Sequence, residues 1–177
     1  MVDAMPGRII LETERLILRE FDEADAPTFL LLCSDPQIIR YTGDPGGGLT
    51  NIEQAAEGIR SRPMADYRKH GFGRWACVLK ATGAVIGFAG LKNLDELSEI
   101  DIGYRFLPAH WGCGLATEAS RATLAYGFDQ LHLTRIIGLV MPDNIASVRV
   151  LEKIGLHYTG IIDYSGQRAA RYVIDKS

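Results

Sequence analysis

The chain has 177 residues, a length that predicts a single domain, residues 1–177, with a substantial core. Apolar residues make up 47% and charged residues 23%, close to the averages of globular domains, which excludes intrinsic disorder, collagen and coiled coil. The 19 basic and 22 acidic side chains give a net charge of −3, so the protein as a whole does not attract nucleic acid or an anionic membrane. An anionic ligand must therefore be held by a local site.

The sequence also argues against a membrane location and against metal chemistry. It has no apolar run near the roughly 20 residues of a membrane helix, and Met1 to Ile10 is too short and polar for a signal peptide. The three cysteines, Cys33, Cys77 and Cys113, are odd in number and widely spaced, and the four histidines are scattered. We expect a cytoplasmic protein with free thiols and no metal.

The N-terminal part predicts one strand and two helices. Arg15 to Arg19 alternates charged and apolar residues, as a half-buried strand does, and Asp22 to Cys33 has helical spacing. The stretch Gly43 to Gly48 reads as a flexible loop. Thr50-Asn51-Ile52-Glu53 resembles a capping box, which predicts an amphipathic helix from there toward Lys69.

Three extended runs follow, and they predict an antiparallel meander. They are Arg74 to Leu79, Val85 to Leu91 and Glu99 to Phe106, separated by residues typical of turns. Because side chains alternate between the faces of a strand, Glu99 and Asp101 share one face of the third run. Two carboxylates are therefore expected side by side.

A glycine-containing turn then opens a helix. Pro108 to Ala119 runs from turn residues into a helical pattern, and Thr134 to Val140 is a nearly continuous apolar run, typical of a strand covered on both faces. Ile145 to Ile154 predicts a short helix that Gly155 ends. The helix between the third run and Thr134 predicts a βαβ crossover.

The C-terminal residues complete the predicted sheet. Tyr158 to Tyr164 and Ala170 to Asp175 read as two strands around a Ser165-Gly166-Gln167 turn. The fold class is therefore α/β (α+β), with one mixed, mostly antiparallel sheet flanked by helices.

The turn before the predicted helix has the chemistry of an anion site. Small residues at 112, 114 and 116 leave backbone N–H groups unobstructed at the positive end of a helix, where phosphate binds. The same glycines are also compatible with a tight turn and nothing more. Neither the P-loop pattern nor the complete dinucleotide-binding pattern is present, which disfavours nucleotide kinases and dehydrogenases.

Several blocks of sequence occur together in a meaningful order. They are Leu11 to Arg19, Val85 to Leu91, Asp101 to Tyr104, Trp111 to Ala119 and Asn144 to Gly155. In these blocks the chain resembles the GNAT superfamily of acetyl-CoA-dependent N-acetyltransferases over nearly its whole length. It is most similar to the branch of ribosomal-protein N-terminal (alanine) acetyltransferases. The resemblance implies a GNAT-like domain with a βαβ core that binds acyl-CoA.

The resemblance also implies which residues bind the cosubstrate. Backbone amides of the loop would hold the CoA pyrophosphate, with Trp111 at a position where the superfamily usually has Gln or Arg. The expected cofactor-binding residues are Trp111, Gly112, Cys113, Gly114, Leu115, Ala116, Thr117, Asn144 and Ser147.

Three residues of the short helix lie on one face, because Asn144, Ser147 and Leu151 are spaced i, i+3 and i+7. By resemblance, Asn144 contacts the pantetheine arm and Ser147 lies near the thioester sulfur. Asn144 also fits a helix cap. Leu151 occupies the position of a tyrosine that protonates the departing thiolate in many members, so Ser147 is the candidate donor to the leaving group.

An amine must lose a proton before it attacks a thioester, so a carboxylate beside the cosubstrate is the expected base, directly or through water. Asp101 and Glu99 are the two candidates, and the sequence does not choose between them. Because an α-amine has a pKa near 8, against about 10.4 for a lysine amine, α-amine acceptors are mildly favoured.

The sequence therefore predicts transfer of the acetyl group from acetyl-CoA to a primary amine, on a peptide N-terminus or a small molecule, by direct attack in a ternary complex. The residues leave the oligomeric state open, and a homodimer is compatible with the resemblance. Two alternatives are an inactive acyl-CoA-binding or sensor module of the same fold, and a nucleotide-binding α/β protein that uses the same glycine turn.

Overall fold

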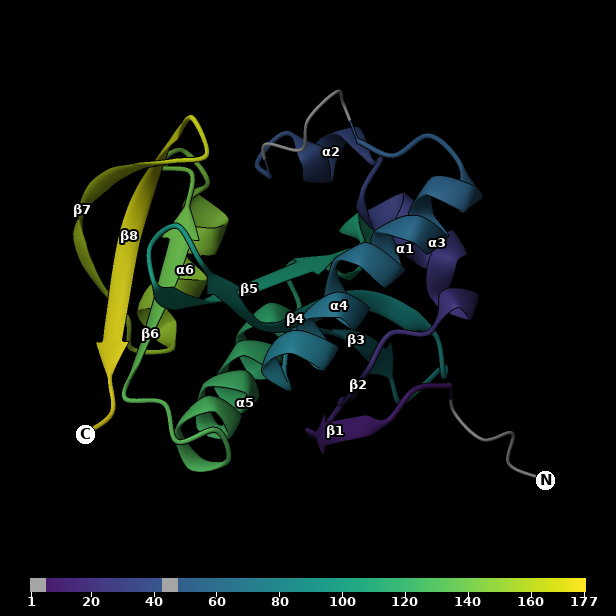
Figure 1. Ribbon diagram of the computed structural model, residues 1–177, viewed down its shortest axis with the longest axis horizontal. Helices are drawn as coiled ribbons and strands as arrows, with labels where there is room; N and C mark the ends of the chain where they lie inside the picture. The colour runs from purple at the N-terminus through teal and green to yellow at the C-terminus, as the bar shows by residue number, and fades with distance from the viewer. Residues whose placement is uncertain (1–5, 43–47) are drawn as a thin grey trace.

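The computed structural model describes residues 6–42 and 48–177, and within them eight strands form one sheet in the order β1-β2-β3-β4-β5-β6-β8-β7 (Figure 1). Neighbouring strands are antiparallel except β5 and β6, which are parallel. The predicted mixed, mostly antiparallel sheet is confirmed. The strands are β1 (Ile9–Glu12), β2 (Leu16–Arg19), β3 (Arg74–Leu79), β4 (Val85–Leu94), β5 (Glu99–Phe106), β6 (Arg135–Val140), β7 (His157–Tyr164) and β8 (Gln167–Asp175).

Six α-helices accompany the sheet in the described residues, with short 3₁₀ segments at Glu23–Asp25 and Pro108–His110. They are α1 (Ala26–Leu32), α2 (Pro36–Ile39), α3 (Ile52–Ser61), α4 (Pro63–His70), α5 (Leu115–Asp129) and α6 (Ile145–Lys153). Helix α5 connects the parallel strands β5 and β6, which confirms the predicted βαβ crossover. None of these helices is long and apolar enough to cross a membrane.

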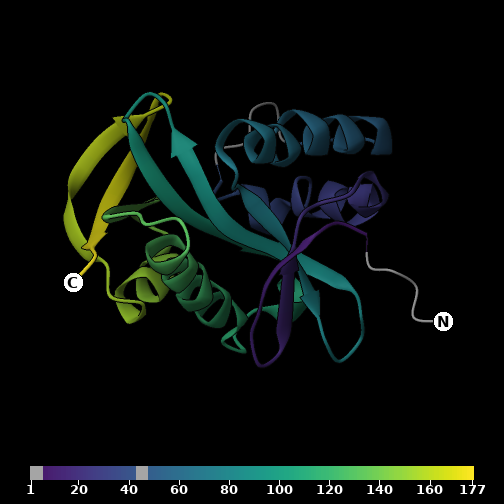
Figure 2. The same ribbon diagram turned by 60° about the horizontal axis from the view of Figure 1, so that its bottom comes forward.

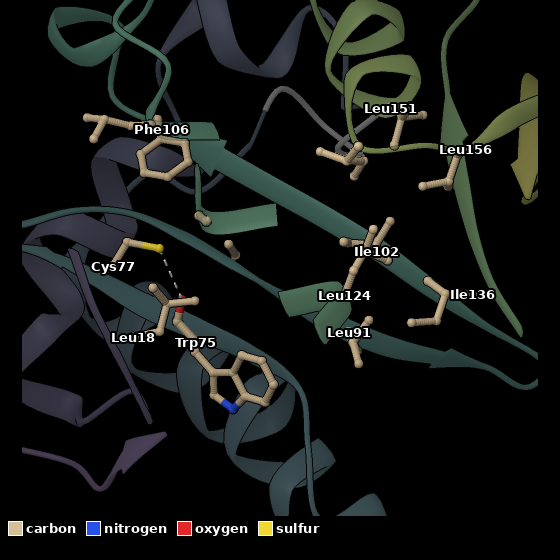
Figure 3. Packing of buried hydrophobic residues seen from close by; sticks show 14 of the residues in the cluster. Leu18, Trp75, Cys77, Leu91, Ile102, Phe106, Leu124, Ile136, Leu151 and Leu156 are labelled. Atoms are coloured by element: carbon tan, nitrogen blue, oxygen red, sulfur yellow. Dashed lines mark hydrogen bonds between the residues drawn. The ribbon is translucent and has the colours of Figure 1, made fainter. Parts of the chain in front are cut away.

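Helices cover both faces of the sheet. Figure 2 shows α1, α3 and α4 on one side and α5 with α6 on the other. The main core lies between the sheet and α5 and includes Leu18, Trp75, Leu91, Ile102, Leu124 and Ile136 (Figure 3). A second cluster, with Phe21, Phe29, Ile59 and Phe88, lies beneath α1 and α3. Burial of this apolar area, at about 25 cal/mol per Å², is the main stabilising contribution.

Two helices differ from their predicted bounds. The segment expected as one helix from Asp22 begins as the 3₁₀ turn Glu23–Asp25, and α1 starts only at Ala26. The helix expected to run toward Lys69 is divided into α3 and α4, because Pro63 lacks the N–H that a continuous helix needs. The predicted loop Gly43 to Gly48 lies, except for Gly48, outside the described residues.

The capping box was predicted one residue too early. The N-cap of α3 is Asn51, whose Oδ1 accepts a hydrogen bond from the amide of Gln54 at 2.8 Å. Gln54 Oε1 in turn accepts from the amide of Thr50 at 2.8 Å. Thr50 and Glu53 do not form the reciprocal pair. The residue after each of them, Asn51 and Gln54 respectively, accepts the hydrogen bonds from the free amides instead.

Candidate active site

The site begins where the two parallel strands separate. Strands β5 and β6 pair at a single register position, Asp101 with Ile137. Beyond it they diverge, β5 running across the molecule while β6 runs beside β8 (Figure 1). The backbone of the last residues of β5 is therefore not covered by a continuous β6 ladder.

The side chain of Asp101 ends this ladder. In a continued parallel pair the amide of Leu139 would donate to a backbone carbonyl of β5, but here it donates to Asp101 Oδ1 at 3.0 Å. Arg74 holds the other side of the same residue: Nη2 donates to Oδ2 at 2.5 Å and Nη1 to the backbone oxygen at 3.1 Å. The carboxylate thus replaces a backbone acceptor at the point of separation.

The environment of Asp101 changes its proton affinity. The residue is buried at 7% exposure, and burial raises the pKa of its carboxyl, although Arg74 and the amide of Leu139 oppose that rise. A carboxylate with a raised pKa is a better base than an exposed one. Both of its oxygens, however, already accept hydrogen bonds.

Glu99, the second candidate base, lies on the same face of β5 and is less buried. Arg171 of β8 donates to both of its carboxylate oxygens, Nε to Oε2 at 3.0 Å and Nη2 to Oε1. Arg171 Nη1 also donates to Thr159 Oγ1 at 3.0 Å. Each candidate base therefore has its own arginine partner, and the structure brings both carboxylates to the face of the sheet opposite α5.

The loop before α5 presents backbone amides to solvent. Gly112 and Gly114 have φ values of 75° and 81°, in the left-handed region that favours glycine, and Gly114 is the N-cap of α5. A Cβ at Gly112 would meet no atom within 4 Å, so its surroundings are open. Exposed glycines at the start of a 15-residue helix fit the predicted phosphate-binding loop.

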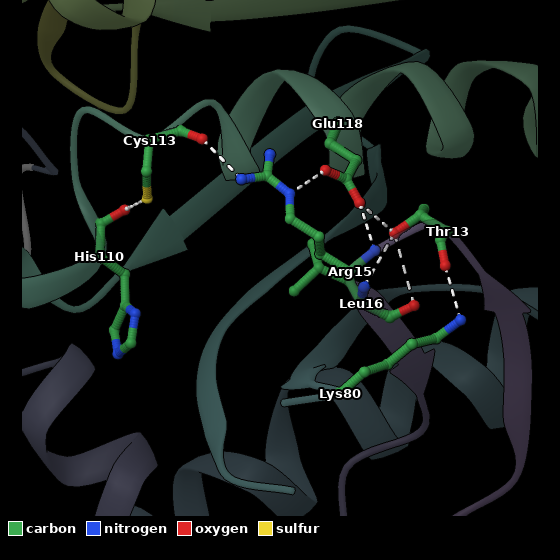
Figure 4. Close-up of polar contacts among 7 residues, drawn as sticks. All are labelled: Thr13, Arg15, Leu16, Lys80, His110, Cys113 and Glu118. Atoms are coloured by element: carbon green, nitrogen blue, oxygen red, sulfur yellow. Dashed lines mark hydrogen bonds and ion pairs between the residues drawn. The ribbon is translucent and has the colours of Figure 1, made fainter. Parts of the chain in front are cut away.

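An ion pair fixes the start of α5 to β2 (Figure 4). Arg15 Nε donates to Glu118 Oε2 at 2.7 Å, and Arg15 Nη1 donates to the backbone oxygen of Cys113 at 2.8 Å. Burial raises the pKa of Glu118, but hydrogen bonds from Thr13 and Arg15 outweigh burial and leave that pKa below its ordinary value. The loop is thus tied to the sheet by a cation that lies beside its amides.

An open hollow of ≈ 600 Å³ adjoins the loop. Its lining includes Gly114 and Thr117 from the predicted loop and three basic side chains, Arg15, Arg121 and Lys153. Arg121 Nη2 donates to the backbone oxygen of Lys153 at 3.3 Å, which links α5 to α6. The carboxylates of Glu14 and Glu118 also line the hollow, so its three cations exceed its two anions by one charge, an excess that suits a phosphate-bearing cosubstrate.

The remaining loop side chains take part in local hydrogen bonds. Trp111 is 48% exposed, and its indole Nε1 donates to the backbone oxygen of Phe106 at 2.8 Å. The thiol of Cys113 donates to the backbone oxygen of His110 at 2.9 Å. Of the other predicted loop residues, Leu115 is buried, whereas Ala116 and Thr117 are partly exposed.

Helix α6 brings a serine to the separated strands. Tyr104 Oη, from β5, donates to Ser147 Oγ at 3.0 Å. Burial raises the pKa of Tyr104, with the Ser147 contact opposing it. Asn144 caps α6 by accepting from the amide of Ser147 at 3.3 Å, so its cap role is confirmed. Leu151 is 4% exposed and packs against Gly138, as a core residue does.

Sequence reasoning missed the partners of the predicted residues. Arg74, Arg171 and Tyr104 each contact a predicted residue of another helix or strand, and Arg121 and Lys153 line the hollow beside the loop. Tyr104 lay within the Asp-Ile-Gly-Tyr block, so the signal for it was available. In the described part of the chain there is no group of three or more His, Cys, Asp or Glu that could hold a metal ion.

The parallel strands β5 and β6 separate, and the exposed start of α5 lies beyond β5, an arrangement suited to an extended, phosphate-bearing ligand. Residues 15–157 match the family model for the acetyltransferase (GNAT) domain. YoaA of Bacillus subtilis (strain 168), named an uncharacterized N-acetyltransferase, is 35% identical over 165 residues, covering 92% of this chain and 92% of YoaA. The chain therefore belongs to the GNAT family and is an acetyl-CoA-dependent N-acetyltransferase.

Solved structures agree on the fold. The acetyltransferase from Agrobacterium tumefaciens strain C58 superposes with a TM-score of 0.81 at 26% identity, covering 99% of this chain and 98% of that one. RimL, a ribosomal L7/L12 α-N-protein acetyltransferase solved in complex with coenzyme A, has a TM-score of 0.78 at 17% identity, covering 95% and 98%. At that identity the similarity to RimL shows the fold alone.

Proposed function

We propose that this N-acetyltransferase transfers the acetyl group of acetyl-CoA to a primary amine by direct attack, with both substrates bound at once. The observation that carries the proposal is the single-position pairing of β5 and β6, which opens the sheet toward the start of α5. The pantetheine arm would lie between the separated strands. The pyrophosphate would be held by the amides of residues 112–117, because free N–H groups at a helix start attract anions.

The basic side chains around the hollow support the same placement. Arg15, Arg121 and Lys153 would hold the phosphate groups outside the loop, and Thr117 would contribute its hydroxyl. Asn144 and Ser147 would face the pantetheine arm from α6. The binding of coenzyme A by RimL is consistent with this use of the fold.

The acceptor would approach from the face that carries Asp101 and Glu99. One of these carboxylates takes the amine proton, directly or through water, and the amine nitrogen then attacks the thioester carbonyl. The new C–N bond gives a tetrahedral intermediate, and its collapse breaks the C–S bond and releases CoA. No covalent enzyme intermediate is formed. An α-amine needs a weaker base than a lysine amine, which favours N-termini and small α-amines as acceptors.

The leaving thiolate would be stabilised by Ser147. Because Ser147 Oγ accepts a hydrogen bond from Tyr104 Oη at 3.0 Å, its own proton is free to point elsewhere. Tyr104 and Ser147 together would take the place of the tyrosine that Leu151 replaces. A thiol pKa near 8.5 makes thiolate a tolerable leaving group, so a hydrogen bond is sufficient support.

The test is a thermal-shift assay with acetyl-CoA, CoA, ATP and NAD in parallel, followed by measurement of CoA release with amines. At ligand 100-fold above Kd the stabilisation is about 2.7 kcal/mol, or about 5 to 11 °C for a domain of this size. A shift with acetyl-CoA and CoA, and CoA release that depends on an amine, is expected. Binding of acetyl-CoA without CoA release in the presence of any amine would contradict the proposal.

The homodimer and the cytoplasmic location stay predictions.

A further inference from the structure

The face of the sheet opposite α5 carries an uneven set of charges. We call it the acceptor face and define it by Arg74, Lys92, Glu99, Asp101 and Arg171. Lys92 is the register partner of Asp101, so both side chains lie on the same face of the sheet. Arg74 belongs to the same face, because a Cβ at Gly103 would lie 2.5 Å from its Nη2.

The two carboxylates of β5 on this face are already neutralised. Asp101 pairs with Arg74 at 2.5 Å, and Arg171 Nε donates to Glu99 Oε2 at 3.0 Å. An acceptor with several positive charges would have to compete with these arginines. The acceptor face therefore does not offer its carboxylates to a polycation.

Of the three basic residues that define the acceptor face, Lys92 alone forms no ion pair with Glu99 or Asp101. It is half-buried, and no residue in the described ranges 6–42 and 48–177 forms a hydrogen bond or ion pair with its ammonium group. Burial lowers the pKa of Lys92, and Arg74 and Arg62 lower it further, while Asp66 and Asp101 oppose them. Asp66 and Asp101 attract this partly desolvated ammonium, but neither forms an ion pair with it, and an incoming anion would supply that direct contact.

The position of Lys92 fixes where that anion would lie. Register partners in antiparallel strands have Cα atoms about 4.5 to 5.5 Å apart, so Lys92 lies next to the residue that ends the β5–β6 ladder. The thioester is proposed at that separation. An anionic group on Lys92 and an amine at the thioester would thus belong to one small molecule or one terminal residue.

We propose that Lys92 binds a carboxylate of the acceptor, so that the substrates are amines with a carboxylate a few bonds away. Free amino acids and peptides that begin with an acidic residue share this chemistry. Polyamines and aminoglycosides lack it. This proposal rests on the proposed function, since it places the acceptor next to the thioester.

The experiment measures binding to the CoA-saturated protein by calorimetry, so that it does not depend on turnover. The first arm compares N-acetyl amino acids with their amides. The second arm compares an N-acetylaspartyl peptide amide with its N-acetylasparaginyl counterpart. Spermidine serves as the cationic competitor, and wild type is compared with Lys92→Met and with Lys176→Met. Lys176 is a suitable control because its Nζ donates to the backbone oxygen of Phe128, away from β5.

In at least one arm, wild type and Lys176→Met are expected to bind the carboxylate ligand about tenfold or more tightly than its neutral partner, a difference that corresponds to about 1.4 kcal/mol. Lys92→Met is expected to reduce this ratio to near one. Three results would overturn the proposal. They are a ratio near one in wild type in both arms, a ratio that persists in Lys92→Met, and tighter binding of spermidine than of the carboxylate ligands. Failure of the proposed function is distinguishable, because it would appear as absent CoA binding or absent CoA release with every amine.

Discussion

Asp101 accepts the amide hydrogen of Leu139 with its side chain, at 3.0 Å, where a backbone oxygen would otherwise serve. The contact joins β5 and β6 at the last point before they separate. Its geometry gives Asp101 a positioning role in addition to the role of candidate base. The two roles are separable, because an amide oxygen can accept the same hydrogen bond without being able to accept a proton from an amine.

Asp101→Asn is expected to lower kcat with little effect on the KM for acetyl-CoA. Asn keeps an oxygen for the Leu139 amide but removes the basic group, together with the oxygen that accepts from Arg74 Nη2, and loss of a general base costs about 100-fold or more in rate. Asp101→Ala removes both functions and is expected to raise the KM for acetyl-CoA as well. Steady-state measurement of CoA release at neutral pH, with acetyl-CoA and the acceptor varied separately, gives both constants.

Glu99→Gln tests the other candidate base in the same assay. Glu96→Gln, at an exposed position in the turn before β5, is the matched control and should leave kcat unchanged. Loss of rate in Glu99→Gln but not in Asp101→Asn would assign the base to Glu99. Unchanged rates in both variants would remove both carboxylates from the chemistry.

The backbone of this site was largely predictable, and its side-chain partners were not. Gly155 ends α6 in a left-handed conformation, and β6 is the covered strand that its apolar run predicts. Both features depend on residues close together in the sequence. The partners of the candidate bases are distant in sequence: Arg74 lies 27 residues from Asp101, and Arg171 lies 72 from Glu99. Periodicity gives the face on which a side chain lies but not the residue that it meets across several strands.

The errors in α3 and α4 have a different origin. Thr50 and Asn51 are both good N-cap residues, and Glu53 and Gln54 are both suited to the position three residues later, so two capping registers compete locally. Only the packing of the helix decides between them. The division at Pro63, in contrast, could have been predicted, since proline seldom continues a helix.

Gly114→Val is expected to weaken acetyl-CoA binding by about tenfold or more. Valine strongly disfavours the φ of 81° found at this N-cap, at a cost of about 1–3 kcal/mol, so the loop must rearrange and its amides no longer converge. Gly83→Val is the matched control, because Gly83 has a φ of 72° in an open β3–β4 turn. Calorimetric titration of both variants with acetyl-CoA separates loss of the anion site from general strain; equal affinities would place the pyrophosphate elsewhere.

Asp25→Ala is expected to reduce the free energy of unfolding by about 3–5 kcal/mol, because it leaves the buried charge of Arg19 without its partner. Arg19 and Asp25 are 3% and 7% exposed, and two hydrogen bonds of 2.8 Å join them. Urea unfolding measures the change. Glu23→Ala, in the same 3₁₀ turn, is the control: its pair with Arg60 is about half exposed and should contribute less than about 1 kcal/mol. Similar losses of unfolding free energy in the two variants would show that burial of the Arg19–Asp25 pair does not set its contribution to stability.

Tyr104→Phe and Ser147→Ala are expected to lower kcat by a similar factor, about tenfold, with little change in the KM for acetyl-CoA. Both changes remove the same hydrogen-bonded unit, in which Tyr104 Oη donates to Ser147 Oγ. The double variant should therefore be no slower than Ser147→Ala alone, whereas independent contributions would multiply to about 100-fold. A substrate with a better thiolate leaving group should reduce the effect of both variants, because it needs less stabilisation at sulfur. If the losses multiply, Tyr104 acts on something other than Ser147, and the pair does not serve the leaving group as a unit.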